Sequence, residues 1–417
     1  MLNKLNDHKK YVLFSYLAMG SNMLTGFVLF PLILNKLGLA ALGVFGLLFS
    51  MRSIIEIGIG WLSGSITKNL IKYKFLKGNI SSLSFVINFA YGLFSFILIV
   101  IYGYMTKEDY IYSIYYFAGF SFISFAIVPF YEIMISELKQ YQVAGFRFLQ
   151  QFLFMVLSIS IFLFFDINSL TYIFMMLFIS VVIVLLSISI YFFNTFSIKF
   201  SFKKINKVLL NKLLLVDGFK YFLNGMSTIL LLQIDVLLID YLYGSESAGI
   251  YLIIWKIPNT IIMLGWRLSD PFSAIVAKGL KSNNHVNIQE QFFTFEKKIL
   301  ISSIFVAMAY YFLSSFILDL WIGKANIPNI EYMYFVPAIV IVFSVMQRLY
   351  LSVNYYTDGL YTVSLLQFME ILFKIIFIIF FFDYFHELAP VVGWLVAFMF
   401  TIWFYRKNSL RVLKYEF

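Results

Sequence analysis

The chain has 417 residues, of which 62% are apolar and 12% are charged, and its formal net charge is +10. A soluble domain carries about 25% charged residues, and a water-exposed surface of this size would need more polar side chains to cover its core. The composition therefore excludes a soluble globular protein and indicates an all-α polytopic membrane protein.

Residue types that support common catalytic chemistry are scarce. The sequence has no cysteine, which excludes disulfides, thiolate catalysis and cysteine metal sites. His8, His285 and His386 lie in the N-terminus or in predicted loops, and their spacing suggests neither a metal site nor a general base. We therefore expect no catalytic residue, no metal site and no enzymatic activity. We also expect no nucleic-acid binding, because no long soluble basic segment exists to carry it.

Twelve apolar runs follow one another along the chain, each near the roughly 20 residues that a membrane-spanning helix requires. They cover residues 11–34, 42–64, 83–104, 111–134, 147–165, 170–193, 215–240, 249–275, 299–318, 332–353, 361–382 and 389–405. The first run is longer than the roughly 7–15 apolar residues of a signal peptide, so we interpret it as a retained helix.

The basic residues fall mostly on one side of this arrangement. With the N-terminus in the cytoplasm, the opposite side receives only Lys36, Lys107 and Lys324. Cytoplasmic loops are enriched in Lys and Arg, so both termini are predicted to be cytoplasmic. The basic segment Lys199–Lys212 separates six spans from six, which predicts an N-terminal lobe over 1–206 and a C-terminal lobe over 207–417. An even number of spans in each lobe makes the two lobes parallel.

A short element near the first span recurs 206 residues later. The aligned pairs are Gly38 with Gly244, Gly43 with Gly249, Phe45 with Tyr251 and Ser21 with Ser227. Glycine permits positive φ, so we interpret these glycines as parts of tight turns. Pro31 and Pro258 lie inside spans, where each removes a helical hydrogen bond and predicts a kink.

Charged residues inside a span are costly, and they mark functional positions or internal ion pairs. Arg52 and Glu56 lie four residues apart in the second span, and Glu370 and Lys374 lie four apart in the eleventh. Each pair could neutralise itself on one helix face, or its members could serve a polar cavity.

Two further cations lie in the eighth span. Lys256 and Arg267 are eleven residues apart, which puts them on one helical stripe about 16 Å apart. Together with Arg52 in the repeat-related second span, they predict a cationic, substrate-binding cavity between the two halves. Snorkelling to the membrane surface is the alternative explanation for Arg267.

Polar residues on the first and seventh spans allow two interpretations. Asn22, Asn224 and Asp235 could form ordinary interhelical hydrogen bonds or line the cavity. Glu56, Asp235 and Glu370 are also candidates for binding a coupling ion, H⁺ or Na⁺, and no other cofactor is expected.

Two stretches carry a resemblance to a known family. The first is Phe30-Pro31-Leu32-Ile33-Leu34-Asn35-Lys36-Leu37-Gly38 followed by Gly43-Val44-Phe45, and the second is Gln233-Ile234-Asp235-Val236-Leu237-Leu238-Ile239-Asp240 followed by Gly249-Ile250-Tyr251. With the twelve-span layout, they resemble the MOP superfamily and, within it, the Wzx-type polysaccharide flippases of bacterial O-antigen assembly.

This resemblance implies a multi-pass transporter of the bacterial inner membrane with two lobes around a central cavity. Its substrate would be an undecaprenyl-diphosphate-linked oligosaccharide, the O-antigen repeat unit, moved from the cytoplasmic to the periplasmic leaflet by alternating access. Arg52, Lys256 and Arg267 would face the diphosphate. The implied partners are membrane lipids, a polysaccharide polymerase and a chain-length regulator.

Other functions compete with this interpretation. A MATE-type multidrug or cation antiporter is the main alternative, but such exporters use acidic residues, whereas the second and eighth spans here are predominantly basic. A flippase for another lipid-linked polysaccharide, of a capsule or an exopolysaccharide, is a further alternative. Lipid II flippases carry two additional C-terminal helices, which are not among the twelve predicted spans, so we favour that role less. A membrane glycosyltransferase or polymerase would need a larger outer loop than the one around Asp319–Glu331.

Overall fold

The computed structural model describes residues 7–73, 76–165, 169–196, 219–269, 272, 275–276, 286–354 and 359–415. The longer helices are α1 (Asp7–Lys72), α2 (Lys77–Thr106), α3 (Ile111–Ser136), α4 (Gln140–Phe164), α5 (Leu170–Thr195), α7 (Phe219–Tyr243), α8 (Ser245–Trp266), α10 (Val286–Ile322), α11 (Phe335–Asn354), α12 (Leu360–Phe380) and α14 (Ala389–Tyr415). The short ones are η3 (Glu108–Tyr110), η5 (Arg267–Ser269), η6 (Lys324–Asn326), α13 (Phe382–Phe385) and η7 (His386–Leu388). The described ranges contain no strand, as an all-α fold requires.

Eleven helices are long and apolar enough to cross a membrane within the described part of the chain. The first covers Lys9–Lys72, and its 64 residues measure about 96 Å, which exceeds the roughly 30 Å hydrocarbon core of a bilayer several times. That helix contains both of the first two predicted spans. Every other predicted span overlaps one helix, although 249–275 extends beyond the end of α8 at Trp266. The polytopic membrane fold is therefore confirmed.

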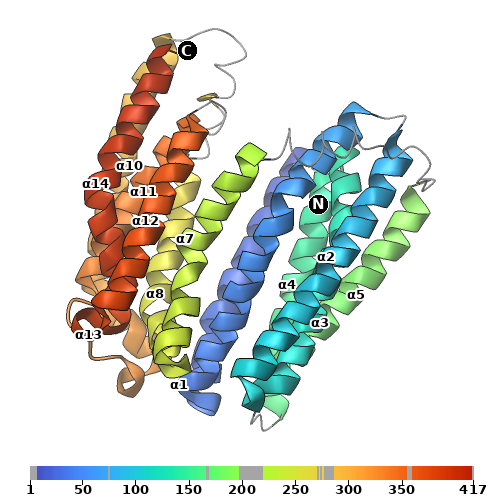
Figure 1. Ribbon diagram of the computed structural model, residues 1–417, viewed down its shortest axis with the longest axis horizontal. Helices are drawn as coiled ribbons and strands as arrows, with labels where there is room; N and C mark the ends of the chain where they lie inside the picture. The colour runs from blue at the N-terminus through green and yellow to red at the C-terminus, as the bar shows by residue number, and fades with distance from the viewer. Residues whose placement is uncertain are drawn as a thin grey trace. The chain divides into compact units, whose positions relative to one another are not determined.

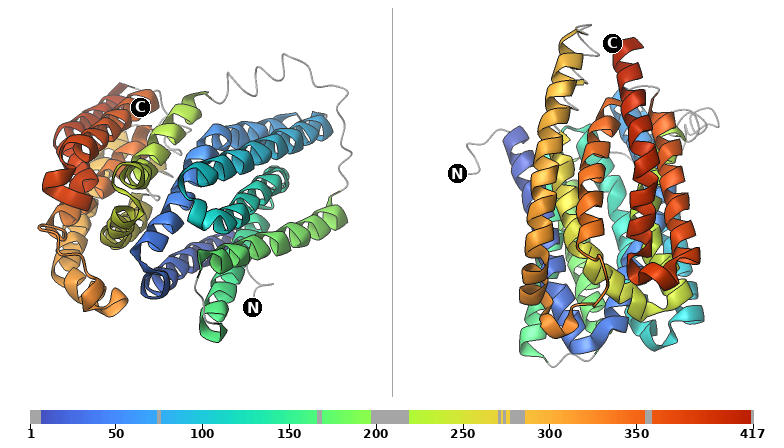
Figure 2. Two further views of the ribbon diagram at one scale, coloured as in Figure 1. Left: turned by 60° about the horizontal axis from the view of Figure 1, so that its bottom comes forward. Right: turned by 90° about the vertical axis from the view of Figure 1, so that its left-hand side faces the viewer.

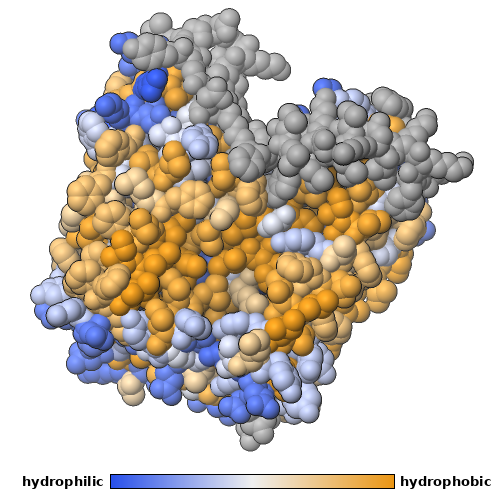
Figure 3. Space-filling model, viewed as in Figure 1, coloured by the Kyte–Doolittle hydropathy of each residue, from blue (hydrophilic) through white to orange (hydrophobic). Residues whose placement is uncertain are grey.

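The surface agrees with a membrane environment. Figure 3 shows apolar residues across the middle of the visible face and polar residues gathered toward its two ends. Large apolar side chains are widely exposed, among them Phe164, Phe305, Phe312 and Phe316. A protein with this much contiguous apolar surface would aggregate in water, whereas the hydrocarbon of a membrane solvates such a surface.

The recurring glycine element adopts the same local structure twice. Gly38 has φ 86° and ψ 178° and is the non-helical residue inside α1, where the chain folds back on itself (Figure 1). Gly244 has φ 90° and ψ 171° and is the single residue between α7 and α8. Both lie in the left-handed half of backbone space that glycine alone adopts readily. The turn interpretation is therefore confirmed for Gly38 and Gly244.

The same interpretation is wrong for Gly43 and Gly249. Both residues are helical, and a Cβ on Gly43 would lie 1.8 Å from the Ser245 carbonyl oxygen and 3.1 Å from the Gly249 nitrogen. These glycines therefore permit close packing of two helices, where a side chain would force the backbones apart.

The chain divides into two compact units. Unit 1 contains Met1–Ala41 and Met51–Phe222, and unit 2 contains Leu42–Ser50 and Leu223–Phe417. The segment Leu42–Ser50 of α1 thus packs with unit 2, where the Ser50 hydroxyl lies 2.9 Å from Gln233 Oε1. The lobe boundary predicted at residue 206 and the whole basic segment Lys199–Lys212 lie outside the described residues.

Unit 1 is organised around α3, which contacts α2, α4 and α5. Aromatic rings fill its core, and Phe117 contacts the rings of Phe120 and Phe174. Hydroxyl pairs join the helices between the rings: Ser95 with Ser121 at 2.8 Å, and Ser113 with Thr171 at 3.0 Å. Such bonds satisfy polar groups that lipid could not satisfy.

Unit 2 is organised around α11 and α14, which contact each other and also α12. The right-hand view in Figure 2 shows α10 and α14 extending to the same end of this unit, close to the C-terminus. Tyr243 at the end of α7 stacks on Phe382 with ring centroids 3.6 Å apart, and its hydroxyl donates to the Ile378 carbonyl oxygen. These contacts join the end of α7 to the end of α12 and the start of α13.

Candidate functional site

A buried ion pair joins α7 and α12 in unit 2. Lys374 Nζ lies 2.6 Å from Asp235 Oδ2, and both side chains are 1% exposed. The Tyr251 hydroxyl of α8 donates to the same carboxylate oxygen at 2.6 Å. Lys374 also donates to the Leu231 carbonyl oxygen at 2.6 Å, and its ammonium lies 4.5 Å from the centre of the Trp394 ring. The site therefore neutralises two charges that bare lipid would exclude.

Glu370 lies one turn before Lys374 but has different partners. Gln347 Nε2 lies 3.0 Å from both of its carboxylate oxygens, Trp394 Nε1 donates at 3.0 Å and the Thr401 hydroxyl donates at 2.9 Å. In the described part of the chain, the Glu370 and Lys374 side chains form no ion pair with each other. Packing with α7 thus determines the partner of Lys374, and helices α11 and α14 satisfy Glu370.

Helices α7 and α12 are also joined about two helical turns before Lys374, at Gln367. Gln367 Oε1 accepts from the Ser227 hydroxyl at 2.6 Å, and Thr228 Oγ1 lies 3.3 Å from the same oxygen. Asn224 is half-buried, and its Oδ1 is buried with no hydrogen-bond partner among the described residues. Interhelical hydrogen bonding therefore accounts for Ser227 and Thr228, which share a face with Asn224, but not for the Asn224 oxygen itself.

Arg52 occupies an aromatic environment in unit 1. Its guanidinium lies 4.6 Å from the centre of the Phe120 ring, and its Nε is buried without a hydrogen-bond partner among the described residues. Glu56 is exposed, and no ion pair joins the two side chains within the described ranges. Arg52 therefore keeps a positive charge that Phe120 orients and Glu56 does not neutralise by contact.

The remaining predicted site residues are less enclosed. Lys256 is half-buried on α8, whereas Arg267 is exposed at the first position of η5. Asn22 is exposed on the first arm of α1. The structure thus brings Asp235 and Lys374 into direct contact and places Glu370 one turn away, while Arg52 lies in the other unit.

Glu132 on α3 carries a buried carboxyl group and is not among the site residues predicted from the sequence. Its side chain is 1% exposed, the Ser84 hydroxyl donates to Oε2, and Oε1 has no hydrogen-bond partner among the described residues. Glu132 lies within the fourth predicted span, 111–134. An acid inside a span is costly, so this position could have identified Glu132 as a candidate site residue.

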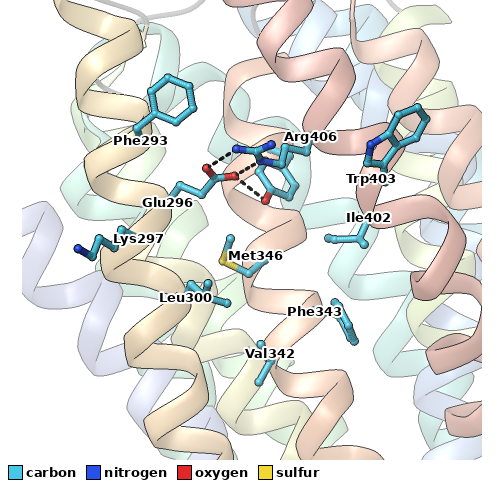
Figure 4. A pocket seen from close by; sticks show the side chains of 11 residues that line it. Phe293, Glu296, Lys297, Leu300, Val342, Phe343, Met346, Ile402, Trp403 and Arg406 are labelled. Atoms are coloured by element: carbon cyan, nitrogen blue, oxygen red, sulfur yellow. Dashed lines mark hydrogen bonds and ion pairs between the residues drawn. The ribbon is translucent and has the colours of Figure 1, made fainter.

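A pocket of about 530 Å³ opens between α10, α11 and α14 of unit 2 (Figure 4). Glu296 lies across its upper part and accepts from Arg406 Nε at 2.7 Å, from Arg406 Nη2 at 3.2 Å and from the Tyr350 hydroxyl at 2.9 Å. Apolar side chains, including Val342 and Phe343, line the lower part. The pocket thus has a charged rim above an apolar lining.

No cluster of three or more His, Cys, Asp or Glu side chains able to hold a metal ion occurs in the described ranges. The polar chemistry present consists of buried carboxylates, an oriented guanidinium and a buried ammonium. These groups can bind and orient charge.

No protein-family model and no curated protein matches the chain, but solved structures do. An inward-facing multidrug resistance MATE transporter of the MOP superfamily matches with a TM-score of 0.68 and 14% identity, over 96% of each chain. The lipid II flippase MurJ, in an inward closed conformation, matches with a TM-score of 0.67 and 13% identity, over 97% of this chain and 90% of that chain. A MOP superfamily transporter from Pyrococcus furiosus matches with a TM-score of 0.63 and 16% identity, over 99% of this chain and 97% of that chain.

The fold is thus that of MOP superfamily transporters over nearly the whole chain. These structural neighbours are transporters and a flippase. At these identities the likeness establishes the fold alone, so the substrate must be argued from the residues of this chain.

Proposed function

We propose that the protein is a flippase that moves an undecaprenyl-diphosphate-linked oligosaccharide, the O-antigen repeat unit, from the cytoplasmic to the periplasmic leaflet of the bacterial inner membrane. It would do so by alternating access of two parallel six-helix lobes with cytoplasmic termini. The twelfth crossing comes from α1, whose length and Gly38 turn allow two spans.

The environment of Arg52 is the observation that carries this proposal. A cation inside a membrane span that has no ion-pair partner by contact in the described residues is suited to an anionic ligand. Arg presents a planar fork that matches phosphate geometry, and stacking on Phe120 orients that fork. A lipid-linked diphosphate supplies the required charge, and the fold is shared with a lipid II flippase.

Lys256 and Arg267 are the proposed second and third contacts of the diphosphate. Arg52 follows Gly38 by 14 residues and Lys256 follows Gly244 by 12, so each lies about 20 Å along its helix from the matching glycine. The proposal therefore takes the two cations to lie at similar depths. Asn22 and Asn224 are proposed to contact sugar hydroxyls.

The direct test measures translocation of lipid-linked oligosaccharide by the purified protein in liposomes. Arg52→Ala, Lys256→Ala and Arg267→Ala should each reduce the rate about tenfold or more, since a hydrogen bond to a charged group contributes about 1.5–3 kcal/mol. Arg147→Ala is the matched control for Arg52→Ala, because it removes an exposed arginine of the same unit that also lies over an aromatic ring, that of Tyr131. Full activity in the Arg52, Lys256 and Arg267 variants would contradict the proposal.

Energy coupling can be tested in the same liposomes. Glu56 and Glu370 are the proposed candidates for responding to H⁺ or Na⁺, whereas the Asp235 carboxylate is already paired with Lys374. A membrane potential alone would act on any transported charge by about 2.3 kcal/mol per 100 mV. Imposing a proton gradient, a sodium gradient or a potential separately identifies which one accelerates translocation.

A MATE-type exporter is the second candidate function. The buried carboxyl of Glu132, which has an unpartnered Oε1 among the described residues, favours it as an acidic site for a cation. Deleting the gene should then sensitise cells to cationic drugs and leave surface polysaccharide intact. The flippase proposal expects the opposite result, and it applies equally to a capsule or exopolysaccharide repeat unit.

A further inference from the structure

The surroundings of the Lys374 ammonium have the composition of a cation-binding site. Its three N–H groups meet a carboxylate oxygen of Asp235, the carbonyl oxygen of Leu231 and the face of the Trp394 ring. Carboxylate and carbonyl oxygens are the groups that coordinate hard cations, and aromatic faces attract cations.

One carboxylate oxygen of the site is not used by the Lys374 ammonium. Asp235 Oδ1 is buried and has no hydrogen-bond partner among the described residues. Tyr251 donates to the other oxygen and therefore holds the carboxylate in place without occupying Oδ1. A spherical ion at the position of Nζ could coordinate both carboxylate oxygens, which a tethered ammonium with directional N–H groups does not.

The site is enclosed by helices of one unit. Asp235 and Leu231 come from α7, Lys374 from α12 and Trp394 from α14. A Cβ on Gly393 would lie 3.0 Å from the Lys374 Cα, so the absence of a side chain there lets α14 bring Trp394 over the ammonium. Glu370 is held by its own three donors and does not compete for the ammonium.

We infer that these groups form a monovalent-cation site that the chain fills with its own ammonium group. Lys374 acts as a tethered cation, so charge balance at Asp235 does not depend on dissolved Na⁺ or K⁺. Removing the ammonium while keeping Asp235 should open the site to a free ion. This inference does not depend on the proposed substrate, because it concerns ion binding within unit 2.

The test compares thermal unfolding of purified wild-type protein and Lys374→Ala in NaCl, KCl and N-methyl-D-glucamine chloride at equal ionic strength. The unfolding temperature of Lys374→Ala should rise by about 5 °C in Na⁺ or K⁺ at a concentration 100 times the dissociation constant. Wild-type protein should show the same unfolding temperature in all three salts. Isothermal titration with Na⁺ and K⁺ should detect one bound ion in the variant.

The double variant Asp235→Asn with Lys374→Ala is the matched control, because it removes the carboxylate and should abolish the salt-specific shift. Lys374→Gln replaces the alanine variant if that variant does not fold, because the glutamine amide oxygen can coordinate the ion. The same rise in unfolding temperature is expected for it. Equal unfolding temperatures for the purified single variant in all three salts would overturn the inference. An equal shift in the double variant would overturn it as well.

Discussion

Gly38 and Gly244, 206 positions apart in the sequence, have almost the same backbone conformation, with φ 86° and ψ 178° at one and φ 90° and ψ 171° at the other. Each is a single non-helical residue between two helical segments. This agreement is the structural evidence that the two halves repeat a helix-turn-helix element, and it locates both turns at glycines because other residues would be strained there.

The first prediction concerns these two turns. Gly38→Ala and Gly244→Ala should each lower the free energy of unfolding by about 1–3 kcal/mol, because a Cβ is strained at this φ and ψ even where space is open. Gly225→Ala is the control, since Gly225 is helical and has nothing within 4 Å of an added Cβ. Unfolding temperatures in detergent measure the effect, and a neutral result at both turns would contradict the strain argument.

The second prediction concerns helix packing at Gly43. Gly43→Ala should destabilise the protein by about 3 kcal/mol, because its Cβ would overlap the Ser245 carbonyl oxygen and the backbone must shift. Gly20→Ala in the same helix α1 has open space and should change stability little. Comparable unfolding temperatures for the two variants would show that the close approach is not needed.

The third prediction concerns the buried ion pair. Asp235→Leu and Lys374→Met should each lower the free energy of unfolding by about 3–5 kcal/mol, because each leaves an unpaired buried charge. The double variant should be more stable than either single variant, since no charge remains. Denaturation titrations of the four proteins give the coupling energy, and additive losses would argue against direct pairing.

The fourth prediction concerns the orientation of Arg52. Phe120→Leu should lower the translocation rate severalfold, because the guanidinium loses the ring that holds it 4.6 Å away. Phe122→Leu is the control, since Phe122 lies on the same helix α3 as Phe120 but packs against Phe89 of α2. Equal translocation by the two variants at equal thermal stability would indicate that Phe120 does not position Arg52.

The fifth prediction concerns the pocket in Figure 4. Glu296→Gln should lower the free energy of unfolding by about 1 kcal/mol, because it removes the charge that receives two Arg406 hydrogen bonds. The effect should shrink at high salt, since Arg406 is partly exposed to screening ions. Tyr350→Phe, which removes a single neutral donor, should cost less and show no salt dependence.

The sequence alone determined the fold class and the positions of the helices. Long apolar runs satisfy lipid only as helices, so composition and run length were sufficient to predict an all-α membrane protein. The turns at Gly38 and Gly244 were also predictable, because glycine permits positive φ and the same short glycine element occurs twice in the sequence. The lobe boundary and the cytoplasmic termini stay predictions, and so does the cationic cavity formed by Arg52, Lys256 and Arg267.

Only the tertiary structure decided which charged groups meet. Glu370 and Lys374 share a helix face in the sequence, yet Lys374 contacts Asp235 of α7 and Glu370 contacts Gln347, Trp394 and Thr401. Spacing along one helix reports which side chains share a face, whereas an ion pair also depends on which neighbouring helix packs against that face and at what height. That register is set by packing across unit 2, including the close approach of Gly393 to Lys374, and no local pattern in the sequence encodes it.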